Sequence, residues 1–121
     1  MAKILVVEDN PNNTEILTRF LVIKKHTVLT AADGPQALTL AGPEKPDLII
    51  MDMGLPGMDG WEVTRRLKED PATRHIPIVA CTASAMPHEV DKAREAGCSD
   101  FEPKPIDFAR LLGKLNRLLT P

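Results

Sequence analysis

The segment DLIIMDMGLPGMDG, from Asp47 to Gly60, decides how this chain folds. Its run Leu48-Ile49-Ile50-Met51 is apolar throughout, which is typical of a strand that is buried on both faces inside a parallel sheet. The run ends on a carboxylate, Asp52, and then breaks into a turn rich in glycine and proline. Because ligands of open α/β sheets bind beyond the carboxyl ends of the strands, this acid lies where a functional site is expected.

Segments with the composition of strands alternate with helical segments along the whole chain. The predicted strands are Lys3–Val7, His26–Ala31, Asp47–Asp52, Ile76–Thr82 and a short one at Ser99–Phe101. The predicted helices lie within 8–22, 33–41, 60–70, 87–97 and 106–119. This strict alternation predicts an α/β fold of the flavodoxin-like (βα)5 type, a doubly wound parallel five-stranded sheet in the order 2-1-3-4-5.

Several residues indicate where the helices begin and end. Asn10 or Asn12 can cap the first helix, and Gly42-Pro43 is expected to end the second. Pro87 suits the first turn of the fourth helix, which we expect to end at Gly97.

Length and composition predict one domain spanning residues 1–121, with no effector domain. The chain has 43% hydrophobic and 26% charged residues and a formal net charge of -2, so it lacks the clustered basic excess of a nucleic-acid-binding protein. It has no apolar run of the ~20 residues that a membrane span needs, and no basic and apolar leader that would predict secretion. We therefore expect a cytoplasmic protein without nucleic-acid or membrane partners.

The cysteines and histidines do not form a recognisable metal or disulfide pattern. Cys81 and Cys98 lack the spacing of a zinc site, and we expect both to be reduced and packed. His26, His75 and His88 have no acid or cysteine partner at ligand spacing, and we expect them to face solvent.

Polar residues follow the ends of four predicted strands. Glu8 and Asp9 follow the first, Asp52 ends the third, Thr82 ends the fourth, and Lys104 comes after the fifth. In the predicted topology all of them converge on one edge of the sheet. Carboxylates crowded in this way repel one another, so they need a cation or raised pKa values, and hard oxygen ligands suit Mg²⁺. Asp52 could then act as a nucleophile towards a phosphoryl group, with positive charge from Lys104 and a hydrogen bond from the Thr82 hydroxyl.

This pattern resembles the receiver domain of two-component response regulators over essentially the whole chain. The matching pieces are VVEDN, DLIIMDMGLPGMDG, IVACTAS and DFEPKP. The resemblance implies that Asp52 is the phosphoacceptor and that Glu8 and Asp9 are metal-binding acids, with the Gly54 carbonyl as a further ligand. It also implies Mg²⁺ as the cofactor, for which Mn²⁺ can substitute.

The resemblance further implies how phosphorylation becomes a signal. Thr82 would be the switch hydroxyl, Phe101 the switch aromatic, and Lys104 the lysine that contacts the phosphoryl group. The surface that changes, and that meets the downstream protein, would comprise the fourth helix, fifth strand and fifth helix, roughly Pro87 to Leu119. The Lys104-Pro105 peptide bond is typically cis in such domains.

We therefore expect a stand-alone, single-domain response regulator. It would accept its phosphoryl group from a histidine kinase or a histidine phosphotransfer protein, and it would be a switch that catalyses its own phosphorylation and dephosphorylation, not an enzyme for an external substrate. Two alternatives stay open: a receiver segment of a larger hybrid kinase or multidomain regulator, and a receiver-like scaffold that is never phosphorylated.

Two other functional classes fit the residues less well. A phosphatase of the haloacid-dehalogenase type needs a second aspartate two residues after Asp52, and Gly54 stands there. A flavodoxin-like FMN carrier needs a hydroxyl-rich phosphate loop after the first strand, where this chain has Glu8-Asp9. Fold alone would not separate these classes, because one fold hosts many functions.

Overall fold

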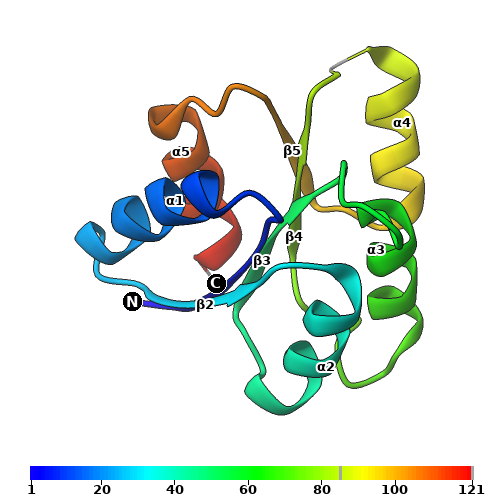
Figure 1. Cartoon of the computed structure of the whole chain (residues 1–121), viewed down its shortest axis with the longest axis horizontal. Helices are drawn as coiled ribbons and strands as arrows, with labels where there is room; N and C mark the ends of the chain where they lie inside the picture. The colour runs from blue at the N-terminus through cyan, green and yellow to red at the C-terminus, as the bar shows by residue number, and fades with distance from the viewer. Residues whose placement is uncertain (85, 121) are drawn as a thin grey trace.

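A computed structural model describes residues 1–84 and 86–120, which form one α/β domain (Figure 1). The strands are β1 (Lys3–Val7), β2 (Thr27–Ala31), β3 (Leu48–Asp52), β4 (Ile78–Thr82) and β5 (Asp100–Pro103). The helices are α1 (Pro11–Ile23), α2 (Gly34–Glu44), α3 (Gly60–Glu69), α4 (Pro87–Ala96) and α5 (Phe108–Leu119). All strand pairs are parallel and the order is β2-β1-β3-β4-β5, so the predicted (βα)5 fold is confirmed.

Helices cover both faces of the sheet, with α1 and α5 on one face and α2, α3 and α4 on the other (Figure 1). Each face has its own apolar core, because alternate residues of a strand point to opposite sides. All of β3 is buried, as expected for the central strand of such a sheet.

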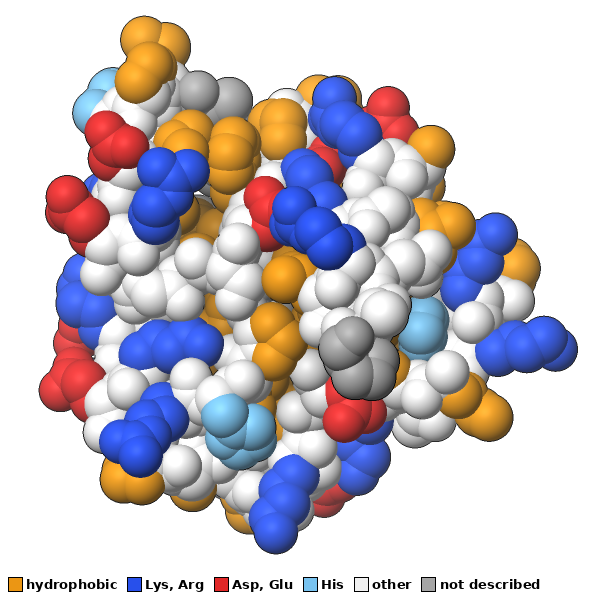
Figure 2. Space-filling view, turned by 180° about the vertical axis from the view of Figure 1, so that it is seen from behind, with side chains coloured by type: hydrophobic (Ala, Val, Ile, Leu, Met, Phe, Trp, Pro, Cys, Tyr) orange, Lys and Arg blue, Asp and Glu red, His pale blue; other side chains and the backbone are white. Residues whose placement is uncertain are grey.

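The surface seen from behind is mixed in charge. Figure 2 shows Lys and Arg side chains separated by uncharged and acidic ones over this face. Within residues 1–84 and 86–120, no helix combines the length and the apolar character that crossing a membrane requires.

The structure decides between the two candidate caps of α1 and corrects the end of α2. The Asn10 side chain accepts hydrogen bonds from the amides of Asn12 and Asn13, so Asn10 is the cap. Helix α2 continues through Gly42-Pro43 to Glu44, where the prediction was wrong. A proline in the last turn removes only one intrahelical hydrogen bond, and its fixed φ is compatible with a helix.

Strands β2 and β3 each begin one residue later than predicted, and the bounds of β4 and β5 and the surroundings of one histidine also differ from expectation. Strand β4 begins at Ile78, after Pro77, while β5 extends past Phe101 to Pro103 and pairs with the end of β4. His26 does not face solvent freely: it is half-buried, and its Nδ1 accepts a hydrogen bond from the Ala2 amide at 3.1 Å. Sequence spacing to acids and cysteines gave no indication of this backbone partner.

Candidate functional site

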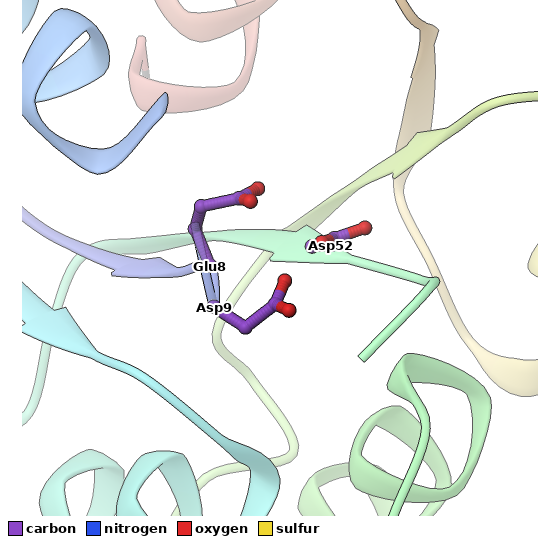
Figure 3. A group of neighbouring side chains, drawn as sticks. All are labelled: Glu8, Asp9 and Asp52. Atoms are coloured by element: carbon purple, nitrogen blue, oxygen red, sulfur yellow. The ribbon is translucent and has the colours of Figure 1, made fainter. Parts of the chain in front are cut away.

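The acidic residues predicted to converge lie together at the carboxyl edge of the sheet (Figure 3). Glu8 and Asp9 follow β1, and Asp52 is the last residue of the neighbouring strand β3. One carboxylate oxygen from each residue lies within 4.8 Å of the other two. Adjacent parallel strands end at the same level, and this is why acids far apart in the sequence become neighbours.

The environment of the three acids differs. Glu8 and Asp52 are buried, with 6% and 4% of their surface exposed, whereas Asp9 is exposed. Burial raises the pKa of the Glu8 carboxyl above its ordinary value, and the charge of Asp52 raises it further. Hydrogen bonds from the Asn10 amide and the Asn13 side chain, at 3.2 and 3.4 Å, oppose this shift.

Lys104 supplies positive charge to this cluster. Its Nζ donates to Oδ1 of Asp52 at 2.9 Å and lies 3.8 Å from Oε2 of Glu8. Burial would lower the pKa of Lys104, but the hydrogen bond and the charge of Asp52 outweigh burial and raise it. One ammonium against three carboxylates leaves an excess of negative charge. A set of oxygen donors with this excess fits a hard divalent cation such as Mg²⁺.

The Asp52 carboxylate is oriented by two donors on the same oxygen. The amide of Gly54 donates to Oδ1 at 2.9 Å, and Lys104 donates to that atom as well. Neither contact engages Oδ2. The carboxylate is therefore fixed in rotation while one oxygen stays outside these two contacts.

Gly60 allows α3 to begin directly against the end of β3. A Cβ atom at this position would lie 2.6 Å from the carbonyl oxygen of Asp52 and 2.6 Å from the Met53 sulfur. Both distances are far below van der Waals contact, so a side chain here would displace the backbone that carries Asp52. The glycine-rich segment after Asp52 is thus explained partly by close packing.

Thr82 and Phe101 lie near this edge but do not contact Asp52 through a hydrogen bond or ring contact in the described part of the chain. The Thr82 hydroxyl is 3.2 Å from both the amide and the carbonyl of Ser84. Phe101 is half-buried and packs against the core on the side of α2, α3 and α4. The structure therefore brings Glu8, Asp9, Asp52 and Lys104 into direct proximity and leaves these two residues at its periphery.

A groove of about 520 Å³ opens between α1 and the segment that leads into α5. Glu8 and Lys104 are among its lining residues, together with apolar side chains such as Ile16, Ile106 and Phe108. Two charged groups of the site can therefore be reached through this groove.

Sequence reasoning missed one charged residue of this region, Glu102. It lies on β5 and is fully buried, and its carboxylate pairs with Arg110 and Lys114 of α5. The strand sequence DFEP has a second acid and a proline, so no apolar pattern marks Glu102 as buried. The one signal in the sequence is that two basic residues lie four apart on the following helix.

Comparison with protein families and curated proteins gives a consistent result. Residues 4–116 match the family model of the response regulator receiver domain. The chain is 44% identical to the response regulator PleD of Caulobacter vibrioides over 117 residues, which cover 97% of this chain but 26% of PleD. It is 36% identical to the polar-differentiation response regulator DivK of Brucella abortus over 116 residues, covering 96% of this chain and 94% of DivK. The chain thus spans about a quarter of one relative and nearly all of the other.

Solved structures agree with the fold. The chemotaxis protein CheY4 of Vibrio cholerae superimposes with a TM-score of 0.92 at 30% identity, covering 98% of this chain and 99% of that chain. The receiver domain of the sensor histidine kinase PA1611 from Pseudomonas aeruginosa gives 0.90 at 36% identity, covering 98% and 97%. The latter structure carries a magnesium ion in its active-site cleft.

Proposed function

Because the chain belongs to the response regulator receiver domain family, we propose that it is a phosphorylated switch of two-component signalling whose phosphoacceptor is Asp52. The observation that supports this assignment most directly is the site itself. One oxygen of each of the three carboxylates lies within 4.8 Å of the other two, and the ammonium of Lys104 lies 2.9 Å from Oδ1 of Asp52. Members of this family are regulators and not enzymes acting on an external substrate.

Asp52 would act as the nucleophile through Oδ2. This oxygen attacks the phosphorus of a phosphohistidine on a histidine kinase or a phosphotransfer protein. The new O–P bond forms as the P–N bond breaks, and the electron pair of that bond stays on the imidazole nitrogen. Gly54 and Lys104 hold Oδ1, so the attacking oxygen is oriented before the donor arrives.

The charged residues around Asp52 would stabilise the transferred group. Phosphoryl transfer asks a protein mainly for positioning and for positive charge around the equatorial oxygens. Lys104 is placed to donate to one of these oxygens. Glu8, Asp9, Asp52 and the Gly54 carbonyl would hold Mg²⁺, or Mn²⁺ in its place, which when bound supplies further positive charge there. The same groups would let the domain catalyse its own phosphorylation and dephosphorylation.

Signalling would follow from rearrangement near the modified aspartate. The Thr82 hydroxyl, held by Ser84 in this structure, would turn towards the phosphoryl group, and Phe101 would move into the space this opens. The output surface would comprise α4, β5 and α5, and a downstream protein would bind there.

We also propose that the chain acts as a single-domain regulator in the cytoplasm. The match to 94% of DivK supports a single-domain form, whereas PleD contains the same unit within a longer chain. A receiver segment of a larger regulator is the competing assignment. Detecting the native protein with an antibody in its source cells distinguishes these two assignments. A band near 13.3 kDa supports the single-domain form, and a larger band supports a receiver segment of a larger regulator.

Incubation with acetyl phosphate, with and without Mg²⁺, tests the central proposal. Intact-mass spectrometry should detect the gain of one phosphoryl group in the presence of Mg²⁺ only. The Asp52→Asn variant should gain none. If the wild-type protein gains no phosphoryl group from acetyl phosphate or from a purified phosphorylated kinase, the unphosphorylated scaffold becomes the better assignment.

A further inference from the structure

Glu102 is a carboxylate placed in the interior of the protein. It is the only fully buried residue of β5, and its side chain has 0% exposure. An ionised carboxylate removed from water is strongly unfavourable unless it is paired and hydrogen-bonded. What surrounds Glu102 therefore has to compensate for its burial.

Both oxygens of Glu102 accept hydrogen bonds. Oε1 accepts from Lys114 Nζ at 2.7 Å. Oε2 accepts from Arg110 Nη2 at 2.8 Å and Nε at 3.3 Å, and from the backbone amide of Asp107 at 3.1 Å. Burial alone would raise the pKa of Glu102, but the bonds from Arg110 and Lys114 outweigh burial and lower it. Glu102 is therefore a charged group held by three residues.

One of these bonds closes the loop that carries Lys104. The loop between β5 and α5 comprises residues 104–107, and the Asp107 amide at its end donates back to the Glu102 carboxylate on β5. Asp107 is also the N-cap of α5, because its side chain accepts from the Arg110 amide at 3.0 Å. Lys104 lies within this closed loop, and its own amide donates to the Thr82 carbonyl at 2.7 Å.

Lys114, one of the partners of Glu102, also contacts Phe101, the residue that precedes Glu102 on β5. Lys114 Nζ donates to the Phe101 carbonyl at 2.5 Å and lies 5.5 Å from the centre of the Phe101 ring. The buried carboxylate thus connects Phe101, the Lys104 loop and the first half of α5.

We propose that Glu102 is a positioning residue for phosphoryl transfer, which anchors the 104–107 loop so that the Lys104 ammonium stays at Asp52. This inference rests on the proposed role of Asp52. The competing explanation is that Glu102 merely joins β5 to α5. The Asp100–Arg117 ion pair joins the same strand and helix without touching the loop, so it provides a matched control.

Two variants of Glu102 separate anchoring from folding. Glu102→Leu removes the acceptors but keeps an apolar side chain of similar size. The Arg110 and Lys114 side chains are 53% and 21% exposed, so their charges can turn towards water when the carboxylate is removed. Glu102→Gln keeps one oxygen that can still accept from the Asp107 amide. We expect the rate of phosphorylation by acetyl phosphate to fall about 10- to 100-fold in Glu102→Leu, since small displacements of a catalytic group have effects of this size. Glu102→Gln should retain an intermediate rate, and Arg117→Gln should stay within about twofold of wild type.

A double-mutant cycle tests whether the effect passes through Lys104. If Glu102 acts by placing Lys104, then Glu102→Leu should add little to Lys104→Ala in the double variant. The Mg²⁺ affinity, followed by fluorescence of the single tryptophan Trp61, should not fall in Glu102→Leu, because the acids lie outside the loop and a displaced Lys104 ammonium no longer competes with the cation. Multiplicative rate effects, or an equal loss in Arg117→Gln, would overturn the proposal.

Amide hydrogen exchange provides a measurement that does not require phosphorylation. In Glu102→Leu, exchange at the amides of Lys104 and Asp107 should accelerate at least about tenfold, while the β1 and β3 amides stay protected. Unchanged or uniformly faster exchange would refute loop anchoring. If wild type fails to take up phosphate but exchange changes locally, the proposed function fails while the anchoring role of Glu102 stands.

Discussion

Replacing Asp9 with asparagine tests whether repulsion among the site carboxylates destabilises the protein without a cation. Two unit charges 4.8 Å apart repel by about 0.9 kcal/mol in water and by about 3.5 kcal/mol at an effective dielectric constant of about 20. Asp9 is exposed, so the smaller value applies to each of its pairs with Glu8 and Asp52. Attraction to Lys104 offsets part of the sum. We therefore expect Asp9→Asn to stabilise the metal-free protein by about 1 kcal/mol.

Urea and thermal unfolding in EDTA and in Mg²⁺ measure this effect. For a domain of this size, 1 kcal/mol corresponds to a rise of about 4 °C in Tm. Mg²⁺ at ten times its Kd should stabilise the wild-type protein by about 1.4 kcal/mol through linkage. If the substitution weakens binding tenfold, the same Mg²⁺ concentration should stabilise Asp9→Asn by only about 0.4 kcal/mol.

Glu95→Gln is the matched control, because it removes an exposed carboxylate of α4 that does not belong to the acidic cluster. It should change neither the stability in EDTA nor the response to Mg²⁺. The electrostatic argument is refuted if Asp9→Asn destabilises the protein in EDTA, or if Mg²⁺ stabilises this variant as much as wild type.

Three further predictions concern packing, thiol reactivity and pH. Gly60→Ala should destabilise the protein in urea by about 1–3 kcal/mol, because its Cβ would meet the Asp52 backbone. Gly113→Ala, in a helix with open space around this position, should stabilise the protein by about 1 kcal/mol. Equal effects of the two substitutions would contradict this. Burial raises the pKa of Cys81 to about 12 and of Cys98 to about 11, so neither thiol should react appreciably with a disulfide reagent at pH 8 until the protein unfolds; rapid reaction of Cys81 in the native protein would refute this. The pKa of Glu102 lies below its ordinary value of 4.5, because hydrogen bonds from Arg110 and Lys114 outweigh its burial. The charge of Glu102 therefore stabilises the fold above about pH 4.5, and this contribution disappears as the pH falls through the folded pKa. The urea midpoints of wild type and Glu102→Gln should therefore converge as the pH is lowered below 4.5, and a constant difference would contradict the argument.

The fold and the position of the site could be predicted from sequence because both depend on strand ends. An apolar run such as Leu48–Met51 must be buried on both faces, and this requires a parallel sheet covered by helices. The topology then places the residues after β1, β3 and β5 at one edge. Glu8, Asp52 and Lys104 could thus be expected as neighbours without any knowledge of side-chain geometry.

Other features depend on partners that sequence spacing does not reveal. The predicted fifth strand ends at Phe101, whereas β5 continues through Glu102, whose buried carboxylate is paired with Arg110 and Lys114. Likewise, the partner of the His26 ring is a backbone amide near the start of the chain, which no pattern of side chains identifies.

The loop between β5 and α5 connects the chemistry of the site to the proposed output surface. At one end, Lys104 is held by Asp52, whose charge would become more negative on phosphorylation. At the other end, Glu102 holds the start of α5, and Lys114 holds Phe101. Phosphoryl oxygens on Asp52 would be a new acceptor for the Lys104 ammonium, and Lys104 lies on a short loop whose two ends are joined to β5 and α5. Because both ends belong to β5 and α5, a change at Asp52 can reach that surface without any large movement of the sheet.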